Sequence, residues 1–262
     1  MILKIIENIG SKTISIFSSI FESFKFISIC ILHMLNPKSY NPAMRMVTTK
    51  QIYFTAVGII PIFIMMALLF GSIIIGVVIS LATEYNLQDK IGSIIIAFVI
   101  DEFAPFFTAL LISLRSGTAI NTEIAVMKVN KELNTLKEYN IDIIDYLFLP
   151  RIISGIVSVV SLSILFAVIM LSSGYLFTLF YMNMDLHTYK LLLISAIEVK
   201  DVIILLVKSI AFGFVTMLIP LYSGLKTGDS YTAIPISVLN GMVKLFIALF
   251  FIEVLSLLLQ SL

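Results

Sequence analysis

The stretch Asp101–Arg151, DEFAPFFTALLISLRSGTAINTEIAVMKVNKELNTLKEYNIDIIDYLFLPR, decides how this chain is organised. It opens with two carboxylates inside an apolar run, becomes charge-rich after Arg115, and turns apolar again at Pro150. The whole chain is 60% hydrophobic and 13% charged, with a mean hydropathy of +1.09, which excludes a soluble globule. We therefore expect an all-α integral membrane protein that keeps one long segment in water.

Five apolar runs are each long enough for the roughly 20 residues that a helix needs to cross a bilayer. We expect spans at Ile52–Ala82, Ile91–Leu114, Arg151–Phe180, Asp201–Tyr222 and Ile236–Leu259. The first run is longer than required and contains Gly58 and Pro61, so we expect a kink or a tilt there. Ser72 and Gly76 form a small-xxx-small pair, which permits close helix packing within one subunit or between two.

The first 50 residues differ from the rest. Apolar residues recur at helical spacing from Ile2 to Ile27, with lysines and glutamates largely on the other side, which predicts an amphipathic helix lying in the membrane interface. A first spanning helix over Ile14–Leu35 is the alternative. Two Asn-Pro pairs, at residues 36–37 and 41–42, then predict a short surface elbow. We assign residues 1–50 to this unit and 51–262 to a five-helix domain.

Lysine and arginine are distributed unevenly over the connecting segments. With the N-terminus in the cytoplasm, twelve of the 17 fall on the inner side. Only Lys90, Lys190 and Lys200 fall on the outer side, while Lys208 and Lys244 lie within spans. By the positive-inside rule, we expect the N-terminus in the cytoplasm and the C-terminus on the outer side of the membrane.

Several functions are disfavoured by composition. The net charge of +1 and the lack of a basic, aromatic-interleaved patch argue against nucleic-acid binding. The lone Cys30 cannot form an internal disulfide, and two histidines, His33 and His187, predicted on opposite sides, give no metal set. No G-x-x-x-x-G-K-[ST] run is present to hold phosphates, so no nucleotide chemistry is expected in this chain.

The charged middle of the opening stretch has a helical pattern. Between Thr122 and Tyr139, apolar residues alternate with lysines and glutamates at helical spacing, which predicts a helix on the cytoplasmic face. Asn140 is expected to end it in a left-handed conformation, and Pro150 suits the first turn of the next helix. An ordinary solvated loop helix is the alternative to a docking element.

The same stretch keeps a specific order of residue types. They are Glu102, Pro105, Arg115, Gly117, Ala119, Glu123, Met127, Lys128, Leu136, Asp142, Tyr146, Leu147 and Leu149 to Arg151. In order and spacing, this pattern resembles the signature of MlaE-type permeases, the membrane subunits of ABC transporters of MCE systems. The family's E-L-G-P reads Glu102-Phe-Ala-Pro105 here, and its acidic D-A-L-E reads Asn134-Thr-Leu-Lys137, so the charge of the docking surface differs.

The resemblance implies a homodimeric permease that moves phospholipid between the inner membrane of a bacterium and a periplasmic MCE-domain protein, and so maintains outer-membrane lipid asymmetry. A soluble ABC ATPase would bind ATP and Mg²⁺, often together with a small STAS-domain protein, and this chain would hold no cofactor and no catalytic residue. The helix at 122–139 would be the coupling helix that enters a groove of the ATPase. Its expected contact residues are Glu123, Met127, Lys128, Lys131, Leu136 and Lys137.

Charges inside the spans indicate where a lipid headgroup could be held. A carboxylate at the centre of a span costs about 2.5–3.5 kcal/mol, so Glu102 should face protein or a wet cavity. Lys208 lies at a depth that differs by about one helical turn, and we expect the two to pair; two separate charges that each face a cavity are the alternative. Lys244 and Glu253 could snorkel or pack against neighbours. We also expect Ile73, Val77 and Leu81, on one face of the first span, to line the lipid cavity, although core packing would give the same stripe.

Other classes of function remain open at this point. A membrane-embedded lipid enzyme would need a catalytic constellation that the sequence lacks. A non-transporting scaffold would use residues 122–139 only for docking, and ATP-dependent lipid movement would distinguish it from a transporter. An ABC permease for another hydrophobic solute shares every feature named here, whereas a permease for a small polar solute would need a polar path through the membrane.

Overall fold

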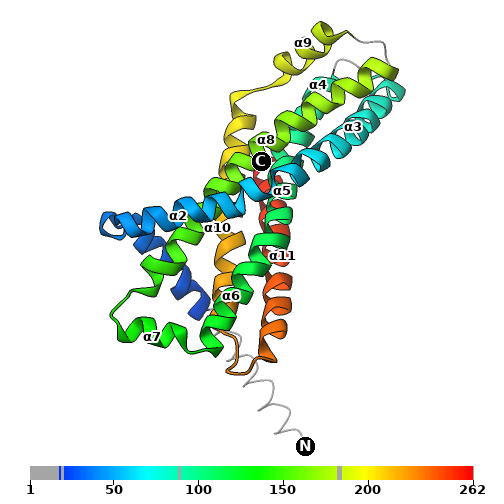
Figure 1. The fold of residues 1–262 in the computed structure, drawn as a ribbon. Helices are drawn as coiled ribbons and strands as arrows, with labels where there is room; N and C mark the ends of the chain where they lie inside the picture. The colour runs from blue at the N-terminus through cyan, green and yellow to red at the C-terminus, as the bar shows by residue number, and fades with distance from the viewer. Residues whose placement is uncertain (1–17, 19–20, 88–89, 182–184, 262) are drawn as a thin grey trace, which may run out of the picture.

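The computed structural model describes residues 18, 21–87, 90–181 and 185–261, and these form an elongated bundle of helices without strands (Figure 1). Five helical stretches in this part of the chain are long and apolar enough to cross a membrane. They are Pro42–Glu84, Ile91–Val129, Ile144–Leu179, Val199–Leu225 and Ala233–Gln260. The predicted all-α fold with five candidate spans is confirmed, and each predicted span lies largely within one of these stretches.

The N-terminal unit is described from residue 21 onward. The predicted amphipathic helix begins in residues 1–17 and 19–20, which lie outside the described residues. Residues 21–35 are helical, and Phe26 packs against Phe148 and Tyr222 with ring centroids 5.8 and 5.2 Å away. The predicted elbow follows as the 3₁₀ turn η1 (Pro37–Ser39), and the side chain of Asn41 then caps α2 (Pro42–Thr55).

The first span bends where the sequence predicts a kink. Helix α2 ends at Thr55, the 3₁₀ turn η2 (Val57–Ile59) follows, and α3 (Ile60–Glu84) continues with Pro61 in its first turn. The glycines of α3 let it approach α8 (Leu149–Tyr181): a Cβ on Gly71 would lie 2.5 Å from the Met170 carbonyl oxygen, and one on Gly76 would lie 2.7 Å from the Phe177 ring. Gly76 therefore serves packing within the subunit.

The helical stretch that contains the second predicted span extends beyond it, to Val129. Helix α4 (Ile91–Ile96), the π-helical segment η4 (Ala97–Phe103), α5 (Ala104–Ile112), the π-helical segment η5 (Ser113–Gly117) and α6 (Thr118–Val129) follow without a break. The helix of the predicted span thus continues past Leu114, and our expectation that one helix covers 122–139 is wrong. The break falls at Lys131, which has a left-handed φ of 61°, and α7 (Glu132–Glu138) follows. Asn140 ends α7 with a φ of 55°, as predicted.

The rest of the bundle packs around α10. The π-helical turn η6 (Ile144–Phe148) leads into α8, α9 (Leu186–Ala196) follows, and α10 (Val199–Leu225) contacts α5, α6, α8 and α11 (Ala233–Gln260). Helix α9 was not predicted, because its eleven residues are too few to span a bilayer; it packs against α4 at the end of the bundle opposite α7 (Figure 1). His187 lies on α9, and His33 lies in helix 21–35.

Candidate functional site

The predicted pair of Glu102 and Lys208 is present at the centre of the bundle. The Lys208 ammonium donates a hydrogen bond to the Glu102 carboxylate and another, of 2.9 Å, to the backbone carbonyl of Asp101. Glu253 of α11 also contacts it, with Oε2 3.0 Å from Nζ, as a charge contact rather than an aligned hydrogen bond. Lys208 is 4% exposed. One lysine therefore joins the second, fourth and fifth spans.

The free carbonyl that Lys208 binds is a consequence of Pro105. Proline has no N–H, so the carbonyl of Asp101, four residues earlier, loses its helical hydrogen-bond partner. The π-helical segment η4 accommodates this defect and contains both Asp101 and Glu102. The Lys208 ammonium satisfies the carbonyl and the Glu102 carboxylate together. The sequence run from Glu102 to Pro105 thus builds an acceptor site for one buried cation.

Gln260 and Asp101 also lie at this centre, and the sequence analysis assigned a role to neither of them. Gln260, near the end of α11, donates a 2.9 Å hydrogen bond to Glu102 Oε1. Asp101 is 4% exposed, and its Oδ1 has no hydrogen-bond partner among the described residues. Glu253 could have been found as a carboxylate within an apolar run, but its depth relative to Lys208 depends on how α11 sits against α10.

The predicted apolar stripe lies elsewhere. Ile73, Val77 and Leu81 are 61%, 52% and 48% exposed on the outer face of α3. They line a shallow depression of about 450 Å³ with Gly76 and Phe177, and neither Glu102 nor Lys208 borders it. The residues that we grouped as one lipid cavity are therefore two separate features within a single chain.

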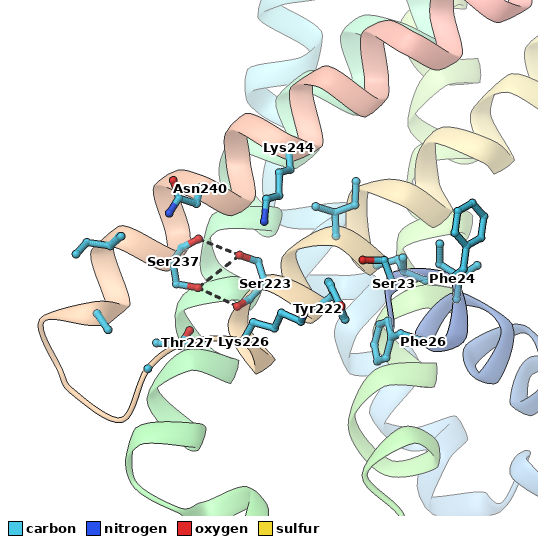
Figure 2. A pocket seen from close by; sticks show the side chains of 16 residues that line it. Ser23, Phe24, Phe26, Tyr222, Ser223, Lys226, Thr227, Ser237, Asn240 and Lys244 are labelled. Atoms are coloured by element: carbon cyan, nitrogen blue, oxygen red, sulfur yellow. Dashed lines mark hydrogen bonds between the residues drawn. The ribbon is translucent and has the colours of Figure 1, made fainter. Parts of the chain in front are cut away.

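A larger cavity, of about 620 Å³, opens between helix 21–35, the end of α10 and the start of α11 (Figure 2). We call it the basal cavity, because it lies towards the end of the bundle that carries α7 (Figure 1). Its floor contains a reciprocal pair of hydrogen bonds: Ser223 Oγ donates to the Ser237 carbonyl at 3.0 Å, and Ser237 Oγ donates to the Ser223 carbonyl at 2.9 Å. Sequence reasoning did not find this cavity.

The six predicted coupling residues fall into three pairs with different surroundings. Glu123 and Lys128 have partners within the chain: Arg151 donates a 2.6 Å hydrogen bond to Glu123, and Lys128 donates one of 2.6 Å to the Leu225 carbonyl. Met127 and Leu136 are partly buried against the core. The other two, Lys131 and Lys137, are exposed at the start and the end of α7. Their side chains extend into solvent at one end of the bundle.

Helix 21–35 is also tied to the segment after α7. His33 Nδ1 lies 2.8 Å from Asp145 Oδ1, and Asp142 lies close enough for all three to offer ligand atoms within 4.8 Å of one another. Asp142 already accepts a 2.8 Å hydrogen bond from the backbone of Ile144. We expected no set of metal ligands around either histidine, but His33 does lie beside two carboxylates. The contact of His33 with Asp145 joins helix 21–35 to the segment after α7, which accounts for the cluster without a metal ion.

Comparison with known proteins gives one family and several relatives. Residues 48–259 match the family described as permease MlaE. A probable ABC transporter permease protein of Rickettsia typhi is 28% identical over 230 residues, which cover 87% of this chain and 86% of the relative. The intermembrane phospholipid transport system permease protein MlaE of Haemophilus influenzae is 22% identical over 227 residues, which cover 86% and 85%. The chloroplastic protein trigalactosyldiacylglycerol 1 of Arabidopsis thaliana is 28% identical over 174 residues, which cover 63% and 49%.

Proposed function

Because this chain belongs to the MlaE permease family, we propose that it is the membrane subunit of an ABC transporter that moves phospholipid between the inner membrane and a periplasmic MCE-domain protein. A separate ATPase hydrolyses ATP, and this chain converts the movement of the ATPase into a change of the membrane bundle. In this proposal the protein works as a homodimer, and its N-terminus lies in the cytoplasm. Maintenance of outer-membrane lipid asymmetry is the role that follows.

The observation that carries the proposal is the continuity of the second span with the candidate coupling segment. Residues Ile91–Val129 form one unbroken helical stretch that contains Glu102, and α7 follows after a single left-handed residue. A partner that moves α7 therefore moves a continuous helical element that passes through the centre of the bundle. Since Glu102 is bound to Lys208, the movement reaches the fourth span as well. Exposed Lys131 and Lys137 supply the polar contacts on the ATPase side.

The exposed stripe on α3 fits a lipid cavity that a second copy would complete. Ile73, Val77 and Leu81 border a depression lined mostly by apolar atoms, which suits acyl chains. Helix α11 is similarly uncovered, with several large apolar side chains exposed. They are Leu239, Val243, Ile247, Phe250, Phe251, Val254 and Leu258. In the homodimer these faces would meet the partner subunit or the lipid that it encloses.

Purification with the co-expressed ATPase, followed by reconstitution into vesicles, tests this function. ATP should drive movement of a labelled phospholipid, and mass spectrometry of the purified complex should find bound phospholipid. Docking of the ATPase without ATP-dependent lipid movement would support the scaffold alternative. If ATP drives the movement of a different hydrophobic solute and not of phospholipid, the chain is still a permease subunit, but phospholipid is not its substrate.

A further inference from the structure

The basal cavity has one apolar wall and one polar end. Phe24 and Ile27 of helix 21–35, with Leu218 and Ile219 of α10, supply the apolar wall. At the other side are Lys226, Thr227, Asn240 and Lys244, and the lining contains no carboxylate among the described residues. Figure 2 shows Lys244 extending from α11 into the space bordered by Ser223, Tyr222 and Phe24. The cavity thus combines positive charge with an apolar surface.

The polar end has hydrogen-bonding capacity that the described chain does not use. Thr227 is 2% exposed, yet its hydroxyl oxygen has no hydrogen-bond partner among the described residues. A buried hydroxyl without a partner costs free energy, so a ligand that bonds to it is favoured. The ammonium of Lys244 likewise has no ion-pair partner in that part of the chain, and it belongs to a stretch that can span the membrane. Both groups border the same cavity.

Lys226 also lines the polar end, but its charge already has a partner. Its ammonium lies 2.8 Å from Glu22 and 4.8 Å above the ring of Tyr222. The hydrogen bond with Glu22 raises the pKa of Lys226, so the side chain stays protonated at physiological pH. Because Glu22 offsets its charge and Tyr222 also holds it, Lys226 is already occupied, while Lys244 is the group that is free to contact a ligand.

We propose that the basal cavity binds an anionic phospholipid from the cytoplasmic leaflet, with its phosphate at Lys244 and Thr227 and an acyl chain against Phe24 and Ile27. The proposal rests on the proposed function only for the cytoplasmic orientation of this end. A phosphate supplies acceptor oxygens for both the ammonium and the hydroxyl. Lysines near an anionic leaflet attract such lipids at about 1 kcal/mol each. The apolar wall favours a lipid over free inorganic phosphate, which has nothing to place there.

The chain contains no tryptophan, so a single Phe24→Trp substitution gives a fluorescent reporter in the cavity. The purified permease, without ATPase or ATP, is placed in phosphatidylcholine nanodiscs that contain brominated phosphatidylglycerol or brominated phosphatidylcholine, either of which quenches tryptophan on contact. We expect the reporter to be quenched by brominated phosphatidylglycerol well beyond its mole fraction. Phe251→Trp, on the exposed face of α11 and outside the cavity, is the matched reporter and should follow the bulk composition.

Lys244→Gln in the Phe24→Trp background should lower the preference for phosphatidylglycerol about fivefold, and Thr227→Val should lower it less. Three results would each overturn the proposal. The two lipids could quench the reporter equally, or Lys244→Gln could leave the preference unchanged. A second copy, or the first residues of the chain, could also shield the reporter from both lipids. Loss of the preference on addition of inorganic phosphate alone would identify a soluble-anion site instead. If the permease moves lipid but the reporter shows no preference for phosphatidylglycerol, only the proposed cavity site is refuted. If the reporter shows the preference but ATP drives no lipid movement, only the transport function is refuted.

Discussion

Lys208 and Lys244 both lie in apolar helices that can span a membrane, and their surroundings are opposite. Lys208 is buried and contacts two carboxylates and a backbone carbonyl. Lys244 borders an open cavity and has no ion-pair partner among the described residues. A lysine with its charge fully compensated holds helices together, whereas one without compensation is free to bind a ligand. The comparison separates a structural centre of the bundle from a candidate binding site.

The largest effect should follow from Lys208→Ala. The substitution leaves Glu102 and Glu253 close together without their shared cation, and removing one partner of a buried ion pair destabilises a protein by about 3–5 kcal/mol. We expect a lower unfolding temperature in detergent and poor assembly with the ATPase. The single cysteine, Cys30, is 1% exposed, so its reaction with a maleimide dye during heating reports unfolding. Normal unfolding and normal lipid movement would refute the structural role of this centre.

A charge-free version of the same centre is the control for that variant. Lys208→Met combined with Glu102→Gln and Glu253→Gln removes the cation and the two anions that contact it. Because a buried ion network can be replaced by neutral side chains with little loss, this triple variant should recover most of the stability that Lys208→Ala loses. If it is as unstable as the single variant, packing of the lysine stem, rather than charge compensation, explains the result.

The cysteine assay depends on a thiol that is unreactive in the folded protein. Burial raises the pKa of Cys30 from 9.0 to about 11, so the reactive thiolate at pH 8 should be about a hundredfold scarcer than for an ordinary cysteine. Labelling of the folded protein should accelerate with each pH unit up to about 11. Folding stability should fall as the pH rises from 9 to 11, because the unfolded chain ionises first. Rapid labelling at pH 7 would show that helix 21–35 detaches from the bundle.

Charge reversal on α7 should affect association with the ATPase rather than folding stability, and by a smaller free energy. Lys131→Glu and Lys137→Glu alter exposed side chains, so the unfolding temperature should not change. If α7 docks on the ATPase, each variant should weaken that association about fivefold, as expected for exposed charge pairs of up to about 1 kcal/mol. Lys190→Glu, on α9 at the opposite end of the bundle, is the matched control for pull-down and for ATPase stimulation. Equal association of all three variants would favour a solvated loop helix.

The sequence predicts features that depend on composition and on depth within the membrane. The five spans, the elbow at Asn36 to Pro42, and the pairing of Glu102 with Lys208 follow from hydropathy, proline sterics and the cost of an unpaired charge.

Contacts that depend on how helices sit against one another could not be predicted. Lys128 binds the Leu225 carbonyl, one of the last carbonyls of α10, which have no partner within their own helix. No spacing in the sequence places that carbonyl beside Lys128. The basal cavity is equally hidden, because its walls come from residues 23–27, 218–228 and 233–244, which are adjacent only in the folded bundle.

Lys244→Gln should have the smallest effect on the stability of the lipid-free protein. An exposed lysine contributes little when, like Lys244 in the part of the chain that the structure describes, it has no ion-pair partner, so we expect a change within about 0.5 kcal/mol in detergent. Addition of phosphatidylglycerol should raise the unfolding temperature of the wild type, since a ligand that binds only the folded state stabilises it, and should raise that of Lys244→Gln less. The maleimide reaction of Cys30 measures the unfolding temperature of each protein with and without lipid. If Lys244→Gln without lipid loses as much stability as Lys208→Ala, the two lysines are not opposites, because Lys244 then has a compensating partner of its own.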